Sequence, residues 1–233
     1  MSLQGSHSWG WEAPLQQEFG LQVGWVDNNT ASLSPGAIYD SEEKTRMVVP
    51  AQLTATMSAM GGSEPTLGLA YPWLGVDAAG APSFWLDTSP STPTLTPAGV
   101  AAKRYIGPAL HNDASQNMTA FTSTRSGRAV RIVYTPQIQA FLATGDLSTA
   151  VSFSVLPFVP TTATEMTAVV GGITNEASAP LYRTFDIWTD SGLTTLAMRA
   201  ATEAGANEQN WVTGIIGCGP VTLGAMYYSC SVS

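Results

Sequence analysis

The chain of 233 residues is 44% hydrophobic but only 11% charged, and its nine Lys and Arg residues leave a net charge of −8. Those nine cations form no run, which argues against a basic patch for sequence-independent nucleic-acid binding. No apolar run approaches the ~20 residues of a membrane-spanning helix. Because soluble domains carry about 25% charged residues, the composition suits a protein that covers its exterior with copies of itself or, equally, a secreted β protein with an uncharged polar surface.

Residues 1–40 are predicted to form an extended N-terminal arm, and residues 41–233 a single domain. Trp9 and Trp11 stand among Gly, Ser and Gln with little periodicity, so they need a place to bury on this domain or on a neighbour. A first strand could cover residues 21–26, where apolar residues alternate with other residues.

Strand and turn signals follow. Residues 47–60 alternate between apolar and polar side chains, which predicts one long strand with a buried face and a polar face. Residues 69–76 and 83–86 predict a hairpin that turns at residues 77–80. Residues 88–97 are rich in Pro, Ser and Thr and predict a loop.

Residues 100–106 and 118–123 are predicted strands, separated by a turn-rich segment at residues 111–115. His111 falls in that segment, and a histidine in a turn is most often solvated. We therefore expect an exposed side chain there.

The stretch from residue 128 to residue 160 predicts a strand, a short helix and a second strand. β-branched residues at alternating positions indicate a strand over residues 128–134. Thr135 can cap a helix and Pro136 fits its first position, with an apolar stripe that ends at Gly145. Alternation then returns over residues 151–156.

The C-terminal part predicts further strands over residues 166–170, 181–188, 210–216 and 221–232. Residues 191–200 fit either a short helix or a strand pair. About ten short strands separated by turns are typical of a sandwich or barrel. We therefore expect an all-β, antiparallel β-sandwich with one or two short helices.

Residues for catalysis are sparse. The chain has two histidines, His7 and His111, and none of the common nucleophile, metalloprotease, phosphate-loop or dinucleotide motifs. Two cysteines and two isolated histidines do not make an ordinary zinc site, and the scattered acids single out neither a hydrolytic pair nor a calcium site. We expect no enzymatic activity, no metal and no cofactor. Cys218 and Cys230 could form a disulfide if the last two strands pair, or could be two buried thiols.

Arg125, Arg128 and Arg131 form the only basic concentration. On a strand, Arg128 and Arg131 point to opposite faces, whereas Arg125 and Arg131 share a parity and could form one patch. Contact with nucleic-acid phosphate is one interpretation. Pairing with a carboxylate of a neighbouring subunit is the other, and the net charge favours it.

Trp73, Phe84 and Trp85 lie near the predicted hairpin and are the best candidates for a carbohydrate-binding platform. Aromatic residues of a β-sandwich belong more often to its core or to an interface. Both interpretations are open at this point.

Two motifs resemble the jelly-roll shell domain of coat proteins from small non-enveloped icosahedral RNA viruses of the nodavirus and tombusvirus kind. The first is R-x-V-R-I-V-Y-T at residues 128–135, followed by a short helix and F-S-V-L-P-F at residues 153–158. The second, at residues 211–228, is W-V-T-G-I-I-G-C-G-P-V-T-L-G-A-M-Y-Y. As an order of elements, the resemblance covers residues 47–232.

The resemblance implies a jelly-roll coat protein that assembles with copies of itself into a shell around a genome, and hence a location in the virion. The sequence departs from the family pattern, because residues 1–40 contain no Lys or Arg and no Asn-Ala dipeptide exists for a maturation cleavage. RNA contacts would then come from scattered arginines. The alternative is a trimeric phage decoration or fibre protein, or a lectin-like β-sandwich, and a glycosidase with paired carboxylates comes third.

Overall fold

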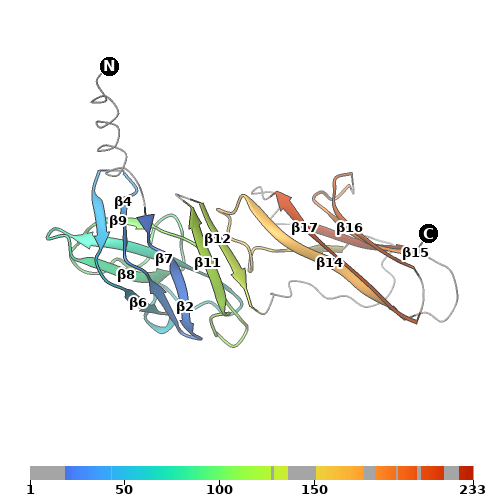
Figure 1. Cartoon of the computed structure of the whole chain (residues 1–233), viewed down its shortest axis with the longest axis horizontal. Helices are drawn as coiled ribbons and strands as arrows, with labels where there is room; N and C mark the ends of the chain where they lie inside the picture. Colours follow the sequence, from blue (N-terminus) through green and yellow to red (C-terminus); the bar gives the residue numbers. More distant parts are fainter. Residues whose placement is uncertain are drawn as a thin grey trace, which may run out of the picture. The chain divides into compact units, whose positions relative to one another are not determined.

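The computed structural model of the chain describes residues 19–42, 44–126, 129–135, 151–175, 182–192, 194–203, 206–217 and 226–232. These residues form strands β1 to β18 and one short 3-10 turn, η1 (Met57–Ala59), and every strand-to-strand ladder is antiparallel. The predicted all-β antiparallel class is confirmed, and the jelly-roll connectivity stays a prediction. The short helix expected after Pro136 lies outside the described residues. The chain divides into two compact units, residues 1–138 and residues 139–233 (Figure 1).

Unit 1 contains a three-stranded sheet β2–β3–β6, a three-stranded sheet β1–β4–β5, a hairpin β11–β12, and a sheet in which β7 has β8 on one side and β9 and β10 on the other. Its strands are β1 (Phe19–Gly20), β2 (Val23–Asp27), β3 (Thr30–Leu33), β4 (Gly36–Tyr39), β5 (Arg46–Val49), β6 (Leu53–Thr56), β7 (Gly68–Asp77), β8 (Pro82–Asp87), β9 (Val100–Tyr105), β10 (Leu110–Asn112), β11 (Phe121–Ser126) and β12 (Ala129–Tyr134).

The predicted hairpin around residues 77–80 is confirmed as β7 and β8. Oδ1 of Asp77 accepts hydrogen bonds from the backbone N–H groups of Ala79 and Ala81, at 2.9 and 2.8 Å, and so closes the turn. Gly80 has a φ of +86°, a conformation that glycine adopts without steric cost.

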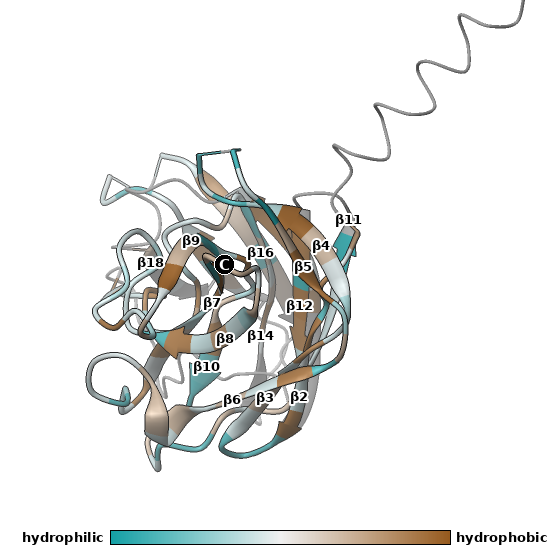
Figure 2. Cartoon of the chain, turned by 90° about the vertical axis from the view of Figure 1, so that its left-hand side faces the viewer, coloured by the Kyte–Doolittle hydropathy of each residue, from teal (hydrophilic) through white to brown (hydrophobic). Residues whose placement is uncertain are grey.

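Strand β7 is buried on both faces, and its side chains point alternately to one face and the other. Ala70 and Leu74 point into the main core of unit 1, whereas Tyr71 and Trp73 join a second, aromatic cluster with Trp85. Strands of this unit carry apolar segments and many of its loops are hydrophilic (Figure 2). A strand buried on both faces is the element around which the unit packs.

The single strand predicted over residues 47–60 is wrong in its length. The segment divides into β5, which pairs with β4, and β6, which pairs with β3, before η1 begins. Pro50 lies at the break, where the missing N–H removes a ladder hydrogen bond. The alternation was real, but it spans two sheets.

Residues 19–40 differ from the extended arm that the sequence predicts. They contain β1 to β4, and Leu21, Val23, Leu33 and Ile38 are at most 2% exposed. Residues 1–18, with both arm tryptophans, lie outside the described residues. The division after residue 138 likewise differs from the single domain predicted over residues 41–233.

Unit 2 contains a four-stranded sheet, β13–β18–β15–β16, and a two-stranded sheet, β14–β17. Its strands are β13 (Val151–Phe153), β14 (Glu165–Asn175), β15 (Tyr182–Trp188), β16 (Leu196–Glu203), β17 (Ala206–Gly217) and β18 (Met226–Val232). Val170, Ile187, Met198 and Ile216 are among the buried residues that both sheets contribute to one core. A Cβ on Gly214 would lie 3.1 Å from Cε of Met198, so the glycine lets β16 and β17 approach closely.

The helix offered for residues 191–200 is wrong, and the strand alternative is confirmed by β16. Oδ1 of Asp190 accepts a hydrogen bond from the backbone N–H of Thr194, and Oδ2 accepts one from Thr195. This aspartate closes a β-turn region rather than capping a helix. Asp40 does the same in unit 1, where Oδ1 accepts from the N–H groups of Lys44 and Thr45.

Candidate functional site

The arginines of the β11–β12 hairpin lie on opposite faces. Arg125 pairs with Val130 and Thr124 pairs with Arg131, and directly opposed residues of an antiparallel pair share a face. The single patch that the shared parity of Arg125 and Arg131 leaves open is therefore not formed. Parity holds along one strand, and these two residues belong to two strands joined by a turn.

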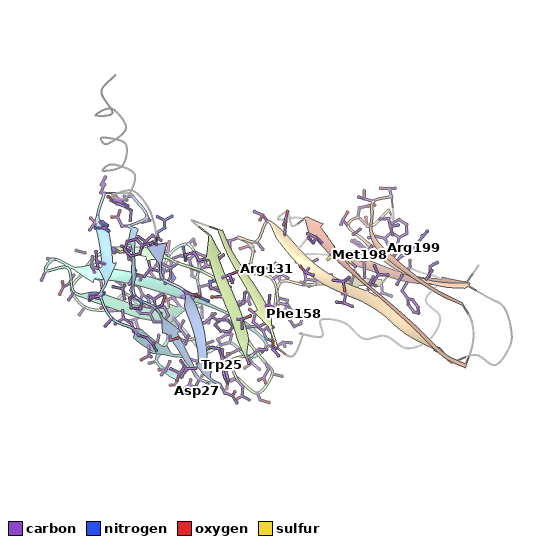
Figure 3. The ribbon with its side chains drawn as sticks, in the orientation of Figure 1. Trp25, Asp27, Arg131, Phe158, Met198 and Arg199 are labelled. Atoms are coloured by element: carbon purple, nitrogen blue, oxygen red, sulfur yellow. The ribbon has the colours of Figure 1, made fainter. Side chains whose placement is uncertain are left out.

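The two arginines also have different surroundings. Nη2 of the Arg125 guanidinium donates a hydrogen bond to the backbone carbonyl of Ile106, and the side chain is half-buried. Arg131, which is labelled in Figure 3, is exposed on the other face of the hairpin. Arg128 lies outside the described residues. Of the predicted phosphate contacts, Arg131 is the described side chain that solvent reaches freely.

The three aromatic residues suggested for carbohydrate binding are buried. Trp73, Phe84 and Trp85 are 4%, 9% and 6% exposed, and Phe84 belongs to a different cluster from the two tryptophans. Nε1 of Trp73 donates a hydrogen bond to the carbonyl of Ser89 at 2.9 Å. Of the two interpretations that the sequence leaves open, burial in the core fits these residues, and the platform does not, because a sugar would have to stack on an exposed ring.

A hollow of about 220 Å³ lies at β6 and β8. Backbone and side-chain atoms of Thr54–Thr56, Ala59 and Phe84–Leu86 line it, so it has no ionisable group. The hollow therefore offers no acid, base or nucleophile of unusual reactivity.

His111 is a buried residue and not the exposed turn residue that the sequence predicts. It belongs to β10, is 3% exposed, and its Nδ1 lies 2.8 Å from Oγ1 of Thr119. Burial lowers the pKa of His111 below its usual value, while the nearby carboxylate of Asp113 raises it in part. Next to it, Nδ2 of Asn112 donates to Oε1 of Glu64 at 3.1 Å. A strand of only three residues between two turns gave no periodic signal in the sequence.

Sequence reasoning also missed an ion pair in unit 2. Arg199 and Asp186 are directly opposed on β16 and β15, with Nε–Oδ1 and Nη2–Oδ2 distances of 2.7 and 2.8 Å. Asp186 is 3% exposed, whereas half of the Arg199 side chain reaches solvent. Arg199 is labelled in Figure 3. The hydrogen bonds and charge of Asp186 raise the pKa of Arg199. On the same sheet, Nε1 of Trp188 donates to Oγ of Ser229 at 3.1 Å.

Exposed apolar side chains are the surface feature that stands out. The exposed large hydrophobic residues are Phe19, Trp25, Val26, Val48, Leu67, Leu95, Val133, Val151, Leu156, Val169, Leu196 and Ile215. The largest exposed fraction among them, 69%, belongs to Ile215 on β17. Single exposed apolar residues are normal, but several of these lie on strand faces in a chain with little charge.

The described residues also bear on a metal site, a membrane-spanning helix and the disulfide. Within the described residues, no three His, Cys, Asp or Glu side chains are grouped to hold a metal ion, and no helix has the length and apolar character to cross a membrane. Cys218 lies outside the described residues, and Cys230 belongs to β18, opposite Phe185. Their disulfide stays a prediction.

Three comparisons with known proteins found no match to this chain, whether against protein-family models, curated proteins or solved structures. The likeness to coat proteins therefore rests on the two sequence motifs.

Proposed function

We propose that the chain is a structural protein of a virus particle that works by associating with copies of itself. Its task is to bury surface against neighbouring copies, and no side chain performs chemistry. The observation that carries the proposal is the set of exposed apolar side chains on strand faces, in a chain with only 11% charged residues. Burying such faces lowers the free energy by roughly 25 cal/mol per Å² of apolar area removed from water.

Low charge supports the same proposal. Monomeric domains keep apart through many surface charges of both signs, and exposed apolar patches without them promote association. Val48, Val133, Val169 and Ile215 are each more than 40% exposed on β-strands. In an assembly these side chains would be covered by a neighbouring copy.

Two forms of the assembly fit this proposal. The coat-protein resemblance favours a closed icosahedral shell around a genome, located in the virion. That family's shell domain would be one sandwich over residues 41–233, whereas this chain has separate cores before and after residue 138. The first resemblance motif also straddles that division. The second form is a trimeric phage decoration or fibre protein.

A packaged genome would need cationic contacts on the inner surface of a shell. Arg131 is exposed and can meet a phosphate, whereas Arg125 is engaged with the Ile106 carbonyl. RNA packaging is therefore proposed with Arg131 as its described contact. Arg131→Ala is expected to lower the RNA content of purified particles and to leave their size unchanged.

The experiment that tests the proposal is the molar mass of the purified full chain, measured by light scattering together with negative-stain microscopy. Uniform hollow particles tens of nanometres across are the expectation for a shell, and a discrete trimer is the expectation for a decoration or fibre protein. A monomer at all protein concentrations, salt concentrations and pH values would refute self-association in both forms.

A further inference from the structure

One face of the sheet β13–β18–β15–β16 places an aromatic row beside a polar row. In the aromatic row, Trp188 on β15 lies opposite Tyr227 on β18, and both side chains are half-buried. In the polar row, Asp186 on β15 lies between Arg199 on β16 and Ser229 on β18. The alternate residues of these strands point into the core of unit 2, so both rows lie on the outer face of the sheet. Strand geometry puts the two rows about 7 Å apart.

The register that aligns the two rows is continuous between β15 and β18. The irregularity of β15 falls in its pairing with β16, between Ile187 and Trp188, where β16 has one extra residue. This bulge therefore leaves Trp188 opposite Tyr227 and on the same face as Asp186.

Hydrogen bonds within the face hold its indole and its guanidinium in place. Nε1 of Trp188 donates to Oγ of Ser229 at 3.1 Å. Nε and Nη2 of Arg199 donate to the two carboxylate oxygens of Asp186, at 2.7 and 2.8 Å. The residues that accept these bonds, Asp186 and Ser229, are only 3% and 9% exposed. Because the indole and the guanidinium are already ordered, a ligand that binds them loses less free energy to side-chain ordering.

The bonds of Arg199 leave donors for a ligand. A guanidinium has five N–H groups, and among the described residues that of Arg199 bonds to Asp186 through Nε and Nη2. Nη1 keeps its two N–H groups, and half of the side chain reaches solvent. The face therefore offers hydrogen-bond donors from a cation whose charge Asp186 already balances.

The charges of the face select a neutral ligand. An anion that drew Arg199 away would leave the buried carboxylate of Asp186 unpaired, which is unfavourable. The next charged position on this face, Glu203, lies two rows further along the strands, at about 13 Å. At the opposite end, the carboxylate of Asp190 is engaged by backbone N–H groups of its own turn. A fitting ligand is therefore uncharged, with an apolar surface for the aromatic row and oxygen acceptors for the guanidinium.

We propose that this face binds a neutral carbohydrate. The C–H surfaces of the sugar rings lie against Trp188 and Tyr227, which supply large and rigid apolar area, and hydroxyl oxygens accept hydrogen bonds from Nη1 of Arg199. Ser152, exposed and opposite Tyr227, adds a hydroxyl to the aromatic row. Two half-buried rings beside a polar row offer a small contact, whereas a stable protein interface takes about 800 Å² from each partner. The inference goes beyond the proposed function and does not depend on self-association.

The test begins with the full chain on an array of immobilised glycans. The neutral probes are oligosaccharides of glucose, mannose, galactose, fucose and N-acetylhexosamines, and the anionic probes are sialylated and sulfated glycans. Binding to at least one neutral glycan is expected, and binding to the anionic probes is expected to be absent. Isothermal titration calorimetry with the best neutral oligosaccharide then gives the dissociation constant of the wild-type chain.

Single substitutions then locate the site. Trp188→Ala and Tyr227→Ala each remove a ring, and each is expected to raise the dissociation constant at least about tenfold. Trp188→Phe keeps a ring but loses the bond to Ser229, so it is expected to bind better than Trp188→Ala. The control is Trp25→Ala, which removes a tryptophan of β2 that is 37% exposed and whose Nε1 is also hydrogen-bonded. It is expected to bind as the wild type does. Far-UV circular dichroism checks that each variant folds.

Three outcomes would overturn the inference. The first is a wild-type chain that binds no neutral glycan, or binds only the anionic set, which would leave the face to a protein partner or to an anion. The second is unchanged binding in the folded Tyr227→Ala and Trp188→Phe variants together, which would place the sugar elsewhere. The third is an equal loss in Trp25→Ala. A monomeric chain that binds a neutral glycan through Trp188 and Tyr227 would support the inference and refute only self-association.

Discussion

Trp73 and Trp85 lie opposite each other on β7 and β8, with ring centroids 6.3 Å apart and planes inclined by 18°, but only the first indole donates a hydrogen bond. The buried Nε1 of Trp85 has no acceptor within the described residues. Trp73→Phe would leave the Ser89 carbonyl without its donor, at a cost of about 1–3 kcal/mol. Trp85→Phe removes an N–H that has no partner.

Both substitutions exchange an indole for a phenyl ring, so the difference between them reports on the hydrogen bond. We expect Trp73→Phe to lower the free energy of unfolding more than Trp85→Phe does. Urea unfolding of the two variants, followed by circular dichroism, measures the difference. Equal losses would show that the Trp73–Ser89 bond contributes nothing beyond packing.

Residue 61 is a glycine because a side chain there would collide with the carboxylate of Asp87. A Cβ on Gly61 would overlap Oδ2 of Asp87, the atom that accepts hydrogen bonds from Oγ1 of Thr94 and the N–H of Leu95, each at 3.0 Å. We expect Gly61→Ala to cost about 1–3 kcal/mol through overpacking and to loosen the loop after β8. Limited proteolysis within that loop measures the second effect.

Gly80→Ala provides the control for this substitution. Gly80 has a positive φ but no atom within 4 Å of an added Cβ, so alanine there costs backbone strain alone. The variant is expected to lose about 1 kcal/mol with no change in cleavage of the loop after β8. Faster cleavage there in Gly80→Ala would contradict the assignment of the effect to the Asp87 contact.

The Arg199–Asp186 pair stabilises unit 2. Arg199→Ala would leave the carboxylate of Asp186 at 3% exposure without its two charged donors. We expect the free energy of unfolding to fall by about 1.5–3 kcal/mol. The loss lies at the lower end of that range because half of the Arg199 side chain is solvated. Arg199→Lys should recover only part of it, because an ammonium cannot make the two parallel bonds. Arg131→Ala, at an exposed arginine, is the control and should be neutral.

His111 makes the stability of unit 1 depend on pH. Because its folded-state pKa lies below the ordinary value of 6.5, the unfolded chain binds the proton more readily. The free energy of unfolding is therefore expected to fall as the pH falls below about 6.5. Thermal unfolding at pH 7.5 and pH 5.5 measures this loss. In His111→Gln the loss should be smaller, and an unchanged loss would assign it to other groups.

Strand formation was readable from the sequence wherever two signals agreed. The β7–β8 hairpin combines apolar runs with the turn of Asp77 to Gly80, and the structure places the turn there. Periodicity of two gave strands but not their partners. It therefore joined β5 and β6, although these strands pair in different sheets.

The candidate site was less predictable, because exposure depends on neighbours that are distant in sequence. The sequence predicts an exposed His111 and leaves Trp73 open between an exposed platform and the core, and both are at most 4% exposed in the folded chain. The shared parity of Arg125 and Arg131 allows one patch, but parity does not carry through the turn between β11 and β12, and the register puts the two residues on opposite faces. The Asp186–Arg199 pair requires the β15–β16 register, which no local pattern determines.

The aspartates that close turns also contribute to the net negative charge of the chain. Asp27, Asp40, Asp77 and Asp113 each accept backbone N–H bonds through Oδ1, and an asparagine carbonyl can accept those same bonds. Exchanging all four for asparagine would take the net charge from −8 to −4. Solubility and isoelectric point can therefore be tuned at loop tips without rebuilding a single turn.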